Sequence, residues 1–522
     1  METTSREVVF EFLDRVGGAV ALTVWCGQGA PAPMLSTTTG DVRMSDCGDG
    51  SHRAELRPSG GRFEVRVAEP SARVGVGDFF PCGRVYRNAF FRIGAYDVFW
   101  SDDRLVFQRS SAWRTCLRRC RFFMELALSG REGARKAVLV RIAVAFLRLF
   151  KRRPLWLVSD RMDAGGDNGE ALFRHLRENR PAIDARFVVS SKSPAFAGLR
   201  GLGPVIACES PLRKLLTLLA DCLISSQAER MFSNPFAGHS EPYRDLLAKI
   251  PLVFLQHGVI KDDLSAVLSR RRRNFAGFVV SAKREMASVV NGAYGYGREA
   301  VWLTGLPRFD LLERRTEKRI AIMPTWRLGL FAGQEPGTGR WLLKAGFPDT
   351  EFCGFYRSLL SNVRLVEACR QHGYRISFLL HPNLMAARDF FTPSDVVEIG
   401  DGAVSYRSCI SDASLLVTDY SSTAFDFAYL RKPVVYAQFD GDAFFGGGHT
   451  YGRGYFDYAR DGFGDVTTTL DATVASVVGL IETGCRLKPE YRRRMDGFFA
   501  FSGNGNCHRV TERILWLAGG VK

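Results

Sequence analysis

The alternation of short apolar runs with helical segments, which begins at Pro154, constrains the fold of this chain more than any other feature. The runs PLWLVSD (154–160), ARFVVSS (185–191) and LVFLQHG (252–258) have the length and content of buried strands. Amphipathic segments such as EALFRHLREN and PLRKLLTLLA separate them. Strands that alternate with helices in this way predict a doubly wound, mostly parallel sheet.

A second set of the same kind begins near residue 301. Its apolar runs are VWLTGLP, RIAIMPTW, RISFLLHP, SLLVTDY and PVVYAQF. Two such sets, at 154–300 and 301–522, predict two Rossmann-like lobes with a cleft between them. At 522 residues the chain is long enough for these lobes and further domains.

Residues 1–112 have a different pattern. Residues that favour strands cluster in VVFEFL (8–13), AVALTVW (19–25), RFEVRVA (62–68) and RLVFQ (104–108), and Gly, Pro, Asp and Ser interrupt them at short intervals. This pattern predicts a small antiparallel β domain, either a sandwich or a barrel. Since the segment carries no recognisable chemistry, we expect an accessory or acceptor-recognition module.

Residues 113–153 hold most of the positive charge of the chain. They contain twelve Lys and Arg against two Glu, which is ten of the sixteen net positive charges. On a helix, with about 100° per residue, Arg141, Arg148 and Arg152 project in the same direction and form a cationic stripe. We therefore expect a basic amphipathic helical segment on an anionic membrane surface, with its arginines reaching outward.

A helix that links two domains, with arginines that reach solvent or acidic partners, is the alternative for this segment. Nucleic acid is not expected as a partner, because no RNP-type strand or recognition-helix motif accompanies the charge. No apolar run reaches the ~18 residues that a spanning helix needs. Twelve cysteines without CxxC spacing, and an N-terminus without a signal pattern, predict a reduced protein at the cytoplasmic face of the membrane.

Polar residues gather where the predicted strands end, which is where open α/β sheets bind ligands. The run at 252–258 ends in Gln256, His257 and Gly258. Four other strand ends deliver a similar set: Arg308 and Asp310; Pro324, Thr325, Trp326 and Arg327; His381 and Pro382; Asp419, Ser421 and Ser422. One histidine at a strand end is commonly structural, but five polar strand ends together predict a ligand site.

The sequence DYSSTAFDFAYL predicts that a helix starts at Ser421 and Ser422. Free N–H groups at such a start, with two hydroxyl side chains, suit a phosphate or a diphosphate. Asp426 lies one turn further along, where its carboxylate would reach the sugar hydroxyls of a bound nucleotide. Simple helix capping is the alternative for Ser421.

The chain resembles the CDP-glycerol:poly(glycerophosphate) glycerophosphotransferases, which are bacterial teichoic-acid and capsule polymerases and primases. The resemblance rests on an ordered series of stretches over about residues 154–515: LVSDRMDAGGDNGEALFRHL, FLQHGVIKDDLS, LTGLPRFDLL, IAIMPTWR, LLHPN, SDASLLVTDYSSTAFDFAYLRKPVVYAQFD and FSGNGNCHRVTERIL. It implies the GT-B architecture, CDP-glycerol as the donor, a lipid-linked acceptor at the membrane, and transfer of glycerol phosphate with release of CMP.

The resemblance also implies residue roles. His257 and His381 fall on catalytic positions, with His257 as the general base and His381 beside the donor diphosphate. The donor-binding positions are Gln256, Gly258, Arg308, Pro324, Thr325, Arg327, Ser421, Ser422 and Asp426. Many members continue the histidine motif as HGTP-x-K, whereas this chain has Val259, Ile260 and Lys261. The acceptor type and the transferred group therefore stay open.

We expect no metal site and no tightly bound cofactor, although a divalent cation such as Mg²⁺ is compatible with the chemistry. Asp440 and Asp442 match the DxD pattern, but they follow a strand in a stretch where GT-B enzymes rarely hold a metal. GGGH (446–449) is either a phosphate loop or a surface loop. Three alternative functions stay open: a GT-B glycosyltransferase with another nucleotide-activated donor, a CDP-ribitol-dependent transferase, and a non-catalytic membrane adaptor. The presence of both histidines argues against the adaptor.

Overall fold

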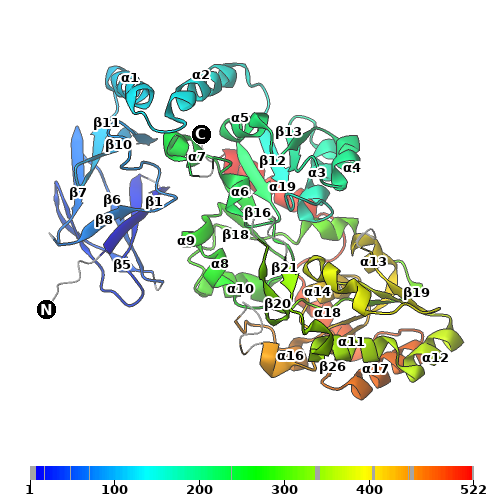
Figure 1. Ribbon diagram of the computed structural model, residues 1–522. Helices are drawn as coiled ribbons and strands as arrows, with labels where there is room; N and C mark the ends of the chain where they lie inside the picture. The colour runs from blue at the N-terminus through cyan, green and yellow to red at the C-terminus, as the bar shows by residue number, and fades with distance from the viewer. Residues whose placement is uncertain are drawn as a thin grey trace.

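The computed structural model describes residues 7–519 except for 17, 48, 70, 237, 336–340, 402–405, 445 and 447–451. Two α/β lobes, each built on one parallel sheet, follow a β domain and a pair of helices along the chain (Figure 1). The prediction of an α/β fold is therefore confirmed, and the strands of the N-terminal part agree with an all-β domain.

Two sheets form the β domain. The first has the order β5 (Ser45–Asp46), β6 (Ser51–Leu56), β2 (Ala19–Trp25), β1 (Glu7–Val16) and β8 (Arg73–Val76). The second has the order β4 (Gly40–Arg43), β3 (Met34–Thr37), β7 (Arg62–Val67), β11 (Arg104–Arg109), β10 (Tyr96–Ser101) and β9 (Phe91–Ile93). Apolar residues of both sheets share one core, in which Phe10, Phe80 and Trp100 contact one another. The domain is therefore a β-sandwich.

Two helices, α1 (Ala112–Leu128) and α2 (Ala134–Phe150), connect the sandwich to the first lobe (Figure 1). The expectation that the arginine stripe reaches outward is wrong for two of its members. Arg141 donates to both carboxylate oxygens of Asp245, and Arg148 donates to the carbonyl of Leu218 at 2.8 Å. These two guanidinium groups turn to the first lobe because acceptors there bind them. The third member, Arg152, lies beyond the end of α2 and is exposed.

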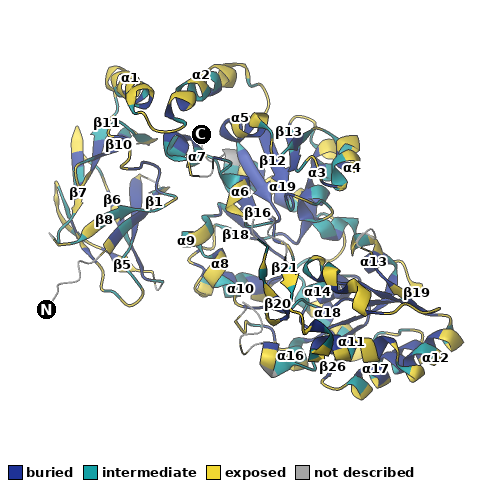
Figure 2. Ribbon diagram, viewed as in Figure 1, coloured by how far each residue is buried: buried dark blue, intermediate teal, exposed yellow. Residues whose placement is uncertain are grey.

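The outer faces of α1 and α2 are instead apolar and exposed (Figure 2). Their exposed large apolar side chains are Trp113, Leu117, Met124, Leu128, Leu139, Ile142, Phe146, Leu147, Leu149 and Phe150. We call this set the apolar hairpin face. None of the helices in the described ranges is long and apolar enough to cross a membrane.

The first lobe has seven parallel strands. Their order is β14 (Val205–Ala207), β13 (Asp184–Val189), β12 (Leu155–Ser159), β15 (Cys222–Ser225), β16 (Leu252–Phe254), β17 (Gly277–Val280) and β18 (Val301–Leu303). The helices along this part of the chain are α3 (Asn168–Asn179), α4 (Ala195–Leu202), α5 (Pro211–Leu219), α6 (Arg230–Ser233), α7 (Arg244–Leu247), α8 (Ser265–Leu268), α9 (Arg270–Arg273) and α10 (Lys283–Asn291). The strands are buried along nearly their whole length, as parallel strands covered on both faces are.

The second lobe has six parallel strands. Their order is β23 (Val397–Ile399), β22 (Arg375–Phe378), β19 (Glu317–Ile322), β24 (Ala413–Thr418), β25 (Val434–Ala437) and β26 (Gly464–Thr467). Its longer helices are α11 (Glu351–Leu360), α12 (Val363–His372), α13 (Tyr406–Asp412), α14 (Thr423–Tyr429), α17 (Leu470–Glu482) and α18 (Pro489–Phe498). A small hairpin, β20 (Phe331–Gln334) and β21 (Trp341–Leu343), follows β19.

The last helix, α19 (Asn506–Gly519), returns to the first lobe, where it packs against α3 and the 3₁₀ turn η2 (Pro307–Leu311). The carboxylate of Asp310 accepts the backbone N–H groups of Asn506 and Cys507 at 3.0 and 2.8 Å, so it caps the start of this helix. Asp310 thus has a structural role in holding the start of α19 against η2. One apolar core contains residues of both lobes, so it holds the two lobes together.

Candidate functional site

The loop after β16 places His257 at the surface between the lobes. Gln256 adopts a left-handed backbone conformation, with φ of 66°, which is uncommon for a residue other than glycine. Its fully buried side chain supports this turn by donating to the carbonyl of Val279 and to Oε1 of Glu285. The side chain of Gln256 therefore shapes the loop from inside, while the side chain of His257 is 63% exposed.

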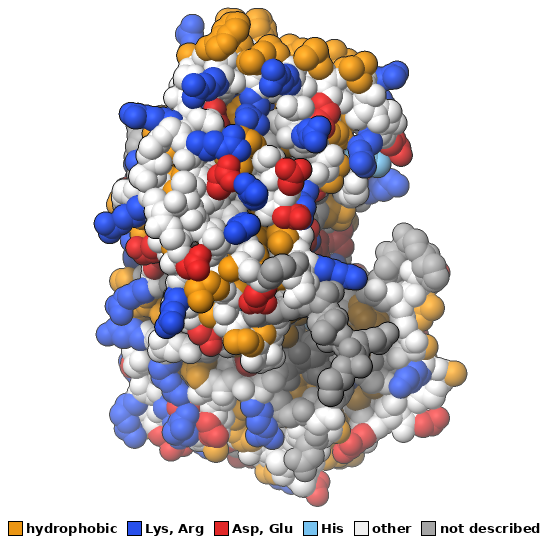
Figure 3. Space-filling view, turned by 90° about the vertical axis from the view of Figure 1, so that its left-hand side faces the viewer, with side chains coloured by type: hydrophobic (Ala, Val, Ile, Leu, Met, Phe, Trp, Pro, Cys, Tyr) orange, Lys and Arg blue, Asp and Glu red, His pale blue; other side chains and the backbone are white. Residues whose placement is uncertain are grey.

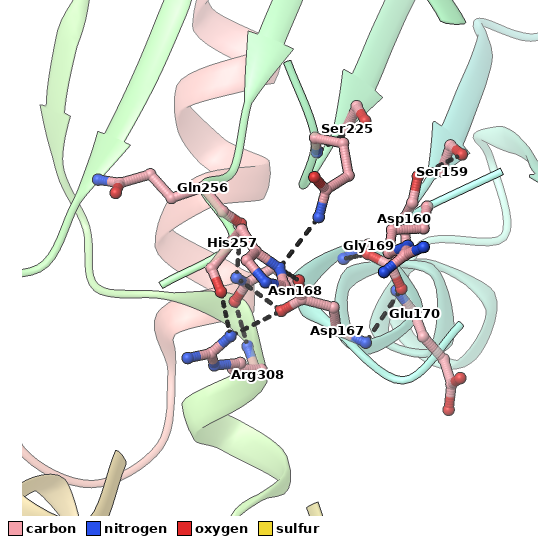
Figure 4. Close-up of polar contacts among 12 residues, drawn as sticks. Ser159, Asp160, Asp167, Asn168, Gly169, Glu170, Ser225, Gln256, His257 and Arg308 are labelled. Carbon is pink, nitrogen blue, oxygen red and sulfur yellow. Dashed lines mark hydrogen bonds and ion pairs between the residues drawn. The ribbon is translucent and has the colours of Figure 1, made fainter. Parts of the chain in front are cut away.

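A carboxylate lies behind His257. Oδ2 of Asp167, in the loop before α3, is 2.8 Å from Nδ1 of His257 (Figure 4). The amide nitrogen of Gln227 lies 3.0 Å from the same ring nitrogen. A carboxylate can only accept and an amide N–H can only donate, so the two neighbours favour opposite tautomers of the imidazole. The charge-assisted bond to Asp167 is the stronger one, which places the hydrogen on Nδ1 and leaves Nε2 as a proton acceptor.

A second buried carboxylate holds the loop that carries Asp167. Asp160, directly after β12, accepts backbone N–H groups from Gly169 at 2.7 Å and from Asp167 and Glu170 at 3.1 Å (Figure 4). A Cβ atom on Gly169 would lie 2.6 Å from Oδ1 of Asp160, so only glycine permits this approach. Burial, with the neighbouring Asp167 charge, raises the pKa of Asp160 to about 7.

Arg308, on η2, connects the histidine loop to the second lobe. One terminal nitrogen donates to Oδ1 of Asp167 at 2.9 Å and to the carbonyl of His257. Nε and the other terminal nitrogen donate to the two carboxylate oxygens of Asp426 at 2.9 and 2.7 Å. The backbone N–H of Arg308 donates to Oδ1 of Asn168 at 2.9 Å, which fixes the turn itself.

The pKa values of Arg308, Asp167 and Asp426 depend on one another. Burial opposes the charge of Arg308, but the two carboxylates outweigh burial and raise its pKa. Burial alone would raise the pKa of Asp167, yet Arg308 and His257 hold it below its ordinary value. Asp426 is 1% exposed, and burial raises its pKa despite the ion pair with Arg308. Asp167 is therefore the firmly ionised member of the pair.

Gly258 is where the histidine loop approaches the predicted phosphate helix. A Cβ atom at Gly258 would lie 2.5 Å from Oγ of Ser422. Ser422 is the residue before α14 and its side chain makes no capping bond, whereas the Oγ of Ser421 accepts the N–H of Thr423 at 3.2 Å. Capping is therefore done by Ser421, and the hydroxyl of Ser422 lies against the histidine loop.

The residues after β19 form a second network in the second lobe. Arg327 is 5% exposed, and its guanidinium bonds to Asp419 at 2.9 Å and to Asp440 at 2.8 Å. Asp419 also accepts the N–H of Thr325 at 2.9 Å. Arg327 and the buried Pro324 thus support the chain just after β19. The Oγ1 of Thr325 is a buried hydroxyl without a partner among the described residues.

His381 lies at the end of β22, in a third group. It precedes a 3₁₀ segment, η5 (Pro382–Phe390), and its Nδ1 accepts the N–H of Asn383 at 3.2 Å. Its ring lies 6.2 Å from that of Trp326. With hydrogen absent from Nδ1, the neutral ring carries its hydrogen on Nε2, which makes His381 a hydrogen-bond donor suited to a phosphate oxygen.

No group of three or more His, Cys, Asp or Glu side chains in the described ranges is placed to hold a metal ion. Asp440 of the DxD pattern is bound by Arg327. The side chain of Asp442 and most of the segment 446–449 lie outside the described residues.

Five residues that build this site had no role predicted from the sequence: Asp160, Asp167, Asn168, Gln227 and Glu285. The one available signal was the Asp-Asn-Gly sequence at 167–169, directly before a predicted helix and after a glycine pair. Carboxylate and amide groups at a helix start are ordinarily caps. Here Asp167 makes no side-chain capping bond and turns to His257 and Arg308.

Comparisons with known proteins agree with the resemblance seen in the sequence. A family model described as CDP-Glycerol:Poly(glycerophosphate) glycerophosphotransferase matches residues 140–516. The minor teichoic acid biosynthesis protein GgaB of Bacillus subtilis (strain 168) is 32% identical over 429 residues, which cover 81% of this chain and 47% of that protein. The teichoic acid ribitol-phosphate polymerase TarK of Staphylococcus aureus (strain NCTC 8325 / PS 47) is 25% identical over 189 residues, 33% of each chain. This chain thus spans less than half the length of the curated relatives that it matches.

The fold is shared with a solved structure of the wall teichoic acid polymerase TagF. The TM-score is 0.54 at 14% sequence identity, and the match covers 79% of this chain and 99% of that one. The family model matches well over half of the chain, and the ordered motifs predicted the same family. The chain therefore belongs to the CDP-glycerol:poly(glycerophosphate) glycerophosphotransferase family.

Proposed function

We propose that the protein transfers glycerol phosphate from CDP-glycerol to a hydroxyl group of a lipid-linked acceptor and releases CMP. The observation that carries this proposal is the exposed imidazole of His257, with a firmly ionised carboxylate behind it and the Arg308 guanidinium beside it. The description of the family names CDP-glycerol, which supports this donor.

In the proposed reaction, the acceptor hydroxyl oxygen attacks the phosphorus atom that carries glycerol. The new bond joins that oxygen to phosphorus, and the bond from phosphorus to the oxygen that bridges the two phosphates breaks. CMP leaves with the bridging oxygen and its electron pair. The hydroxyl proton moves to Nε2 of His257, which acts as the general base.

The second lobe supplies hydrogen-bond donors for the diphosphate. The Nε2–H of His381, the hydroxyl of Thr325 and the hydroxyl of Ser422 all belong to residues at strand ends or at the start of α14. Such fixed donors stabilise the charge that develops on the leaving phosphate. No covalent intermediate is needed, because one proton acceptor and one set of phosphate donors complete the reaction.

A ribitol phosphate donor is the second candidate. Three of the relatives are named as ribitol-phosphate or poly(ribitol-phosphate) polymerases, each 24 to 25% identical over about a third of this chain. The two donors differ only in the polyol, so the diphosphate and cytidine contacts proposed above apply to both. The residues that contact the polyol would determine which of the two donors binds.

We further propose that the apolar hairpin face attaches the enzyme to the membrane that holds its acceptor. Hydrophobic side chains gather at the end of the molecule that α1 and α2 form, with Lys and Arg side chains directly beneath them (Figure 3). An apolar face with a basic rim fits the boundary between acyl chains and anionic headgroups. Arg114, Arg119 and Arg121 are among the exposed basic residues of α1.

Isothermal titration with a matched set of donors tests the proposed activity. We expect CDP-glycerol to bind more tightly than UDP-sugars and more tightly than CMP, since the cytidine and the second phosphate both contribute. CDP-ribitol binding more tightly than CDP-glycerol would reassign the donor to ribitol phosphate. Tightest binding of a UDP-sugar would overturn the proposal in favour of a glycosyltransferase.

A further inference from the structure

We propose that a residue of the second lobe positions the general base of the first. In this arrangement Asp426 holds Arg308, Arg308 keeps Asp167 ionised, and Asp167 orients His257. The base is therefore correctly prepared only when the two lobes are closed on each other. This inference rests on the proposed role of His257, and it concerns the positioning residues behind that histidine.

The first step is the choice of tautomer. His257 can accept a proton through Nε2 only while Nδ1 carries the hydrogen. Asp167 imposes that state by accepting from Nδ1 at 2.8 Å, against the competing amide of Gln227 at 3.0 Å. If Asp167 became protonated, it could donate to Nδ1 instead, and both neighbours would then favour the wrong tautomer.

The second step is the charge of Asp167. Its side chain is 14% exposed, and burial of a carboxylate favours the protonated form. Arg308 prevents this by donating to Oδ1 at 2.9 Å, and the pKa of Asp167 stays low. The same terminal nitrogen of Arg308 also donates to the carbonyl of His257, so the arginine fixes both the charge behind the ring and the backbone beside it.

The third step is the contact between Arg308 and the second lobe. Arg308 directs Nε and its second terminal nitrogen to the two oxygens of Asp426, on α14 of the second lobe. A planar guanidinium held on one edge by a bidentate pair has a fixed orientation on its other edge. Asp426 is buried with both oxygens engaged, which makes it a positioning residue and not, as the sequence suggested, a ligand of the nucleotide sugar.

The opposing explanation is that Asp426 and Arg308 merely hold the lobes together. Asp310 provides the matched control for it, because it also joins distant parts of the chain through η2, at α19, without contacting Arg308 or Asp167. A loss of general rigidity would appear in Asp310→Asn and in Asp426→Asn alike. A loss of base positioning would appear only in Asp426→Asn.

The test reads the tautomer of His257 by ¹⁵N NMR of the full chain labelled at histidine, with His257→Gln to assign the signal. We expect a protonated Nδ1 in the wild type and in Asp310→Asn, and a shift toward hydrogen on Nε2 in Asp167→Asn and Asp426→Asn. A wild-type spectrum from Asp426→Asn would overturn the proposal. If Asp426→Asn does not fold, Arg308→Lys serves in its place, since lysine keeps the charge but cannot bridge two carboxylates.

Kinetics with CDP-glycerol then separate this inference from the proposed function. We expect kcat to fall about 10²- to 10⁴-fold in Asp167→Asn and about tenfold in Asp426→Asn, with little change in KM for the donor. The double variant should lose no more than Asp167→Asn alone, because both substitutions break one chain of contacts. Additive losses would contradict the coupling. If the tautomer of His257 shifts as expected in the variants but His257→Ala keeps full activity, His257 is not the general base. That result would also refute the proposed function.

Discussion

The guanidinium of Arg141 on α2 donates to both carboxylate oxygens of Asp245, at 2.7 and 2.8 Å. The two side chains are only 10% and 18% exposed, so the pair is shielded from water. This contact decides which side of the helical hairpin faces the lobe. Arg141 and Arg148 attach α2 to the first lobe, and the apolar hairpin face stays exposed.

Replacing Arg141 with alanine should weaken this attachment of α2. The substitution leaves the Asp245 carboxylate half-buried without its cation, and breaking such a pair costs about 3 kcal/mol. Urea unfolding should report this loss, whereas Arg152→Ala, at an exposed position just after α2, should change the free energy of unfolding very little. Equal effects of the two substitutions would contradict this role of Arg141.

Membrane attachment should depend on the apolar hairpin face more than on charge. We expect Leu139→Ser/Phe146→Ser/Phe150→Ser to abolish flotation with anionic vesicles at both low and high salt, since these side chains are 58 to 70% exposed. Arg119→Glu/Arg121→Glu should weaken flotation at low salt only, because salt screens exposed charges. A triple serine variant that floats like the wild type would refute the attachment.

The close approach of Gly258 to Ser422 predicts a steric effect with a specific rescue. Gly258→Ala would place a methyl group 2.5 Å from the Ser422 hydroxyl, so the loop and the helix must separate. We expect a loss of about 1 to 3 kcal/mol in the free energy of unfolding. Adding Ser422→Ala removes the obstructing oxygen and should restore most of that stability. Absence of rescue would show that the strain lies elsewhere.

The raised pKa of Asp160, about 7, predicts a pH-dependent contribution to stability. Its folded-state pKa lies above its unfolded value, so the fold favours the protonated form. This stabilisation is full below about pH 4 and is lost as pH rises toward about 7. The wild type should therefore lose stability relative to Asp160→Asn between pH 5 and pH 7, with no further change above pH 8. A difference that grows in favour of the wild type would show that the three N–H bonds dominate instead.

Helices and strands with a regular spacing of apolar residues were predictable from the sequence. The contacts between residues far apart in the chain were not. Apolar runs that end in polar residues located both sheets and the strand ends with His257 and His381. Nothing local indicates that Arg308 pairs with Asp426, which lies 118 residues away, or that His257 pairs with Asp167, 90 residues earlier. Such pairs are set by how the lobes close, which a pattern of neighbouring residues does not record.

For the arginine stripe too, the local pattern was predictable and the distant contacts were not. The spacing of Arg141 and Arg148 correctly indicated one face of α2, since a period of 3.6 residues fixes which side chains point together. The prediction was wrong for Arg152, which lies beyond the end of α2 at Phe150. Which way that face turns depends on acceptors far along the chain, and Asp245 lies 104 residues from Arg141.

We propose above that His257 is the general base for transfer from CDP-glycerol. The most direct measurement is CMP release from CDP-glycerol with a soluble acceptor analogue, together with the calorimetric affinity for the donor, for the wild type and His257→Ala. We predict that turnover falls about 10²- to 10⁴-fold while donor affinity changes by less than about threefold. His381→Ala should lower both. Turnover by His257→Ala close to that of the wild type would contradict the account.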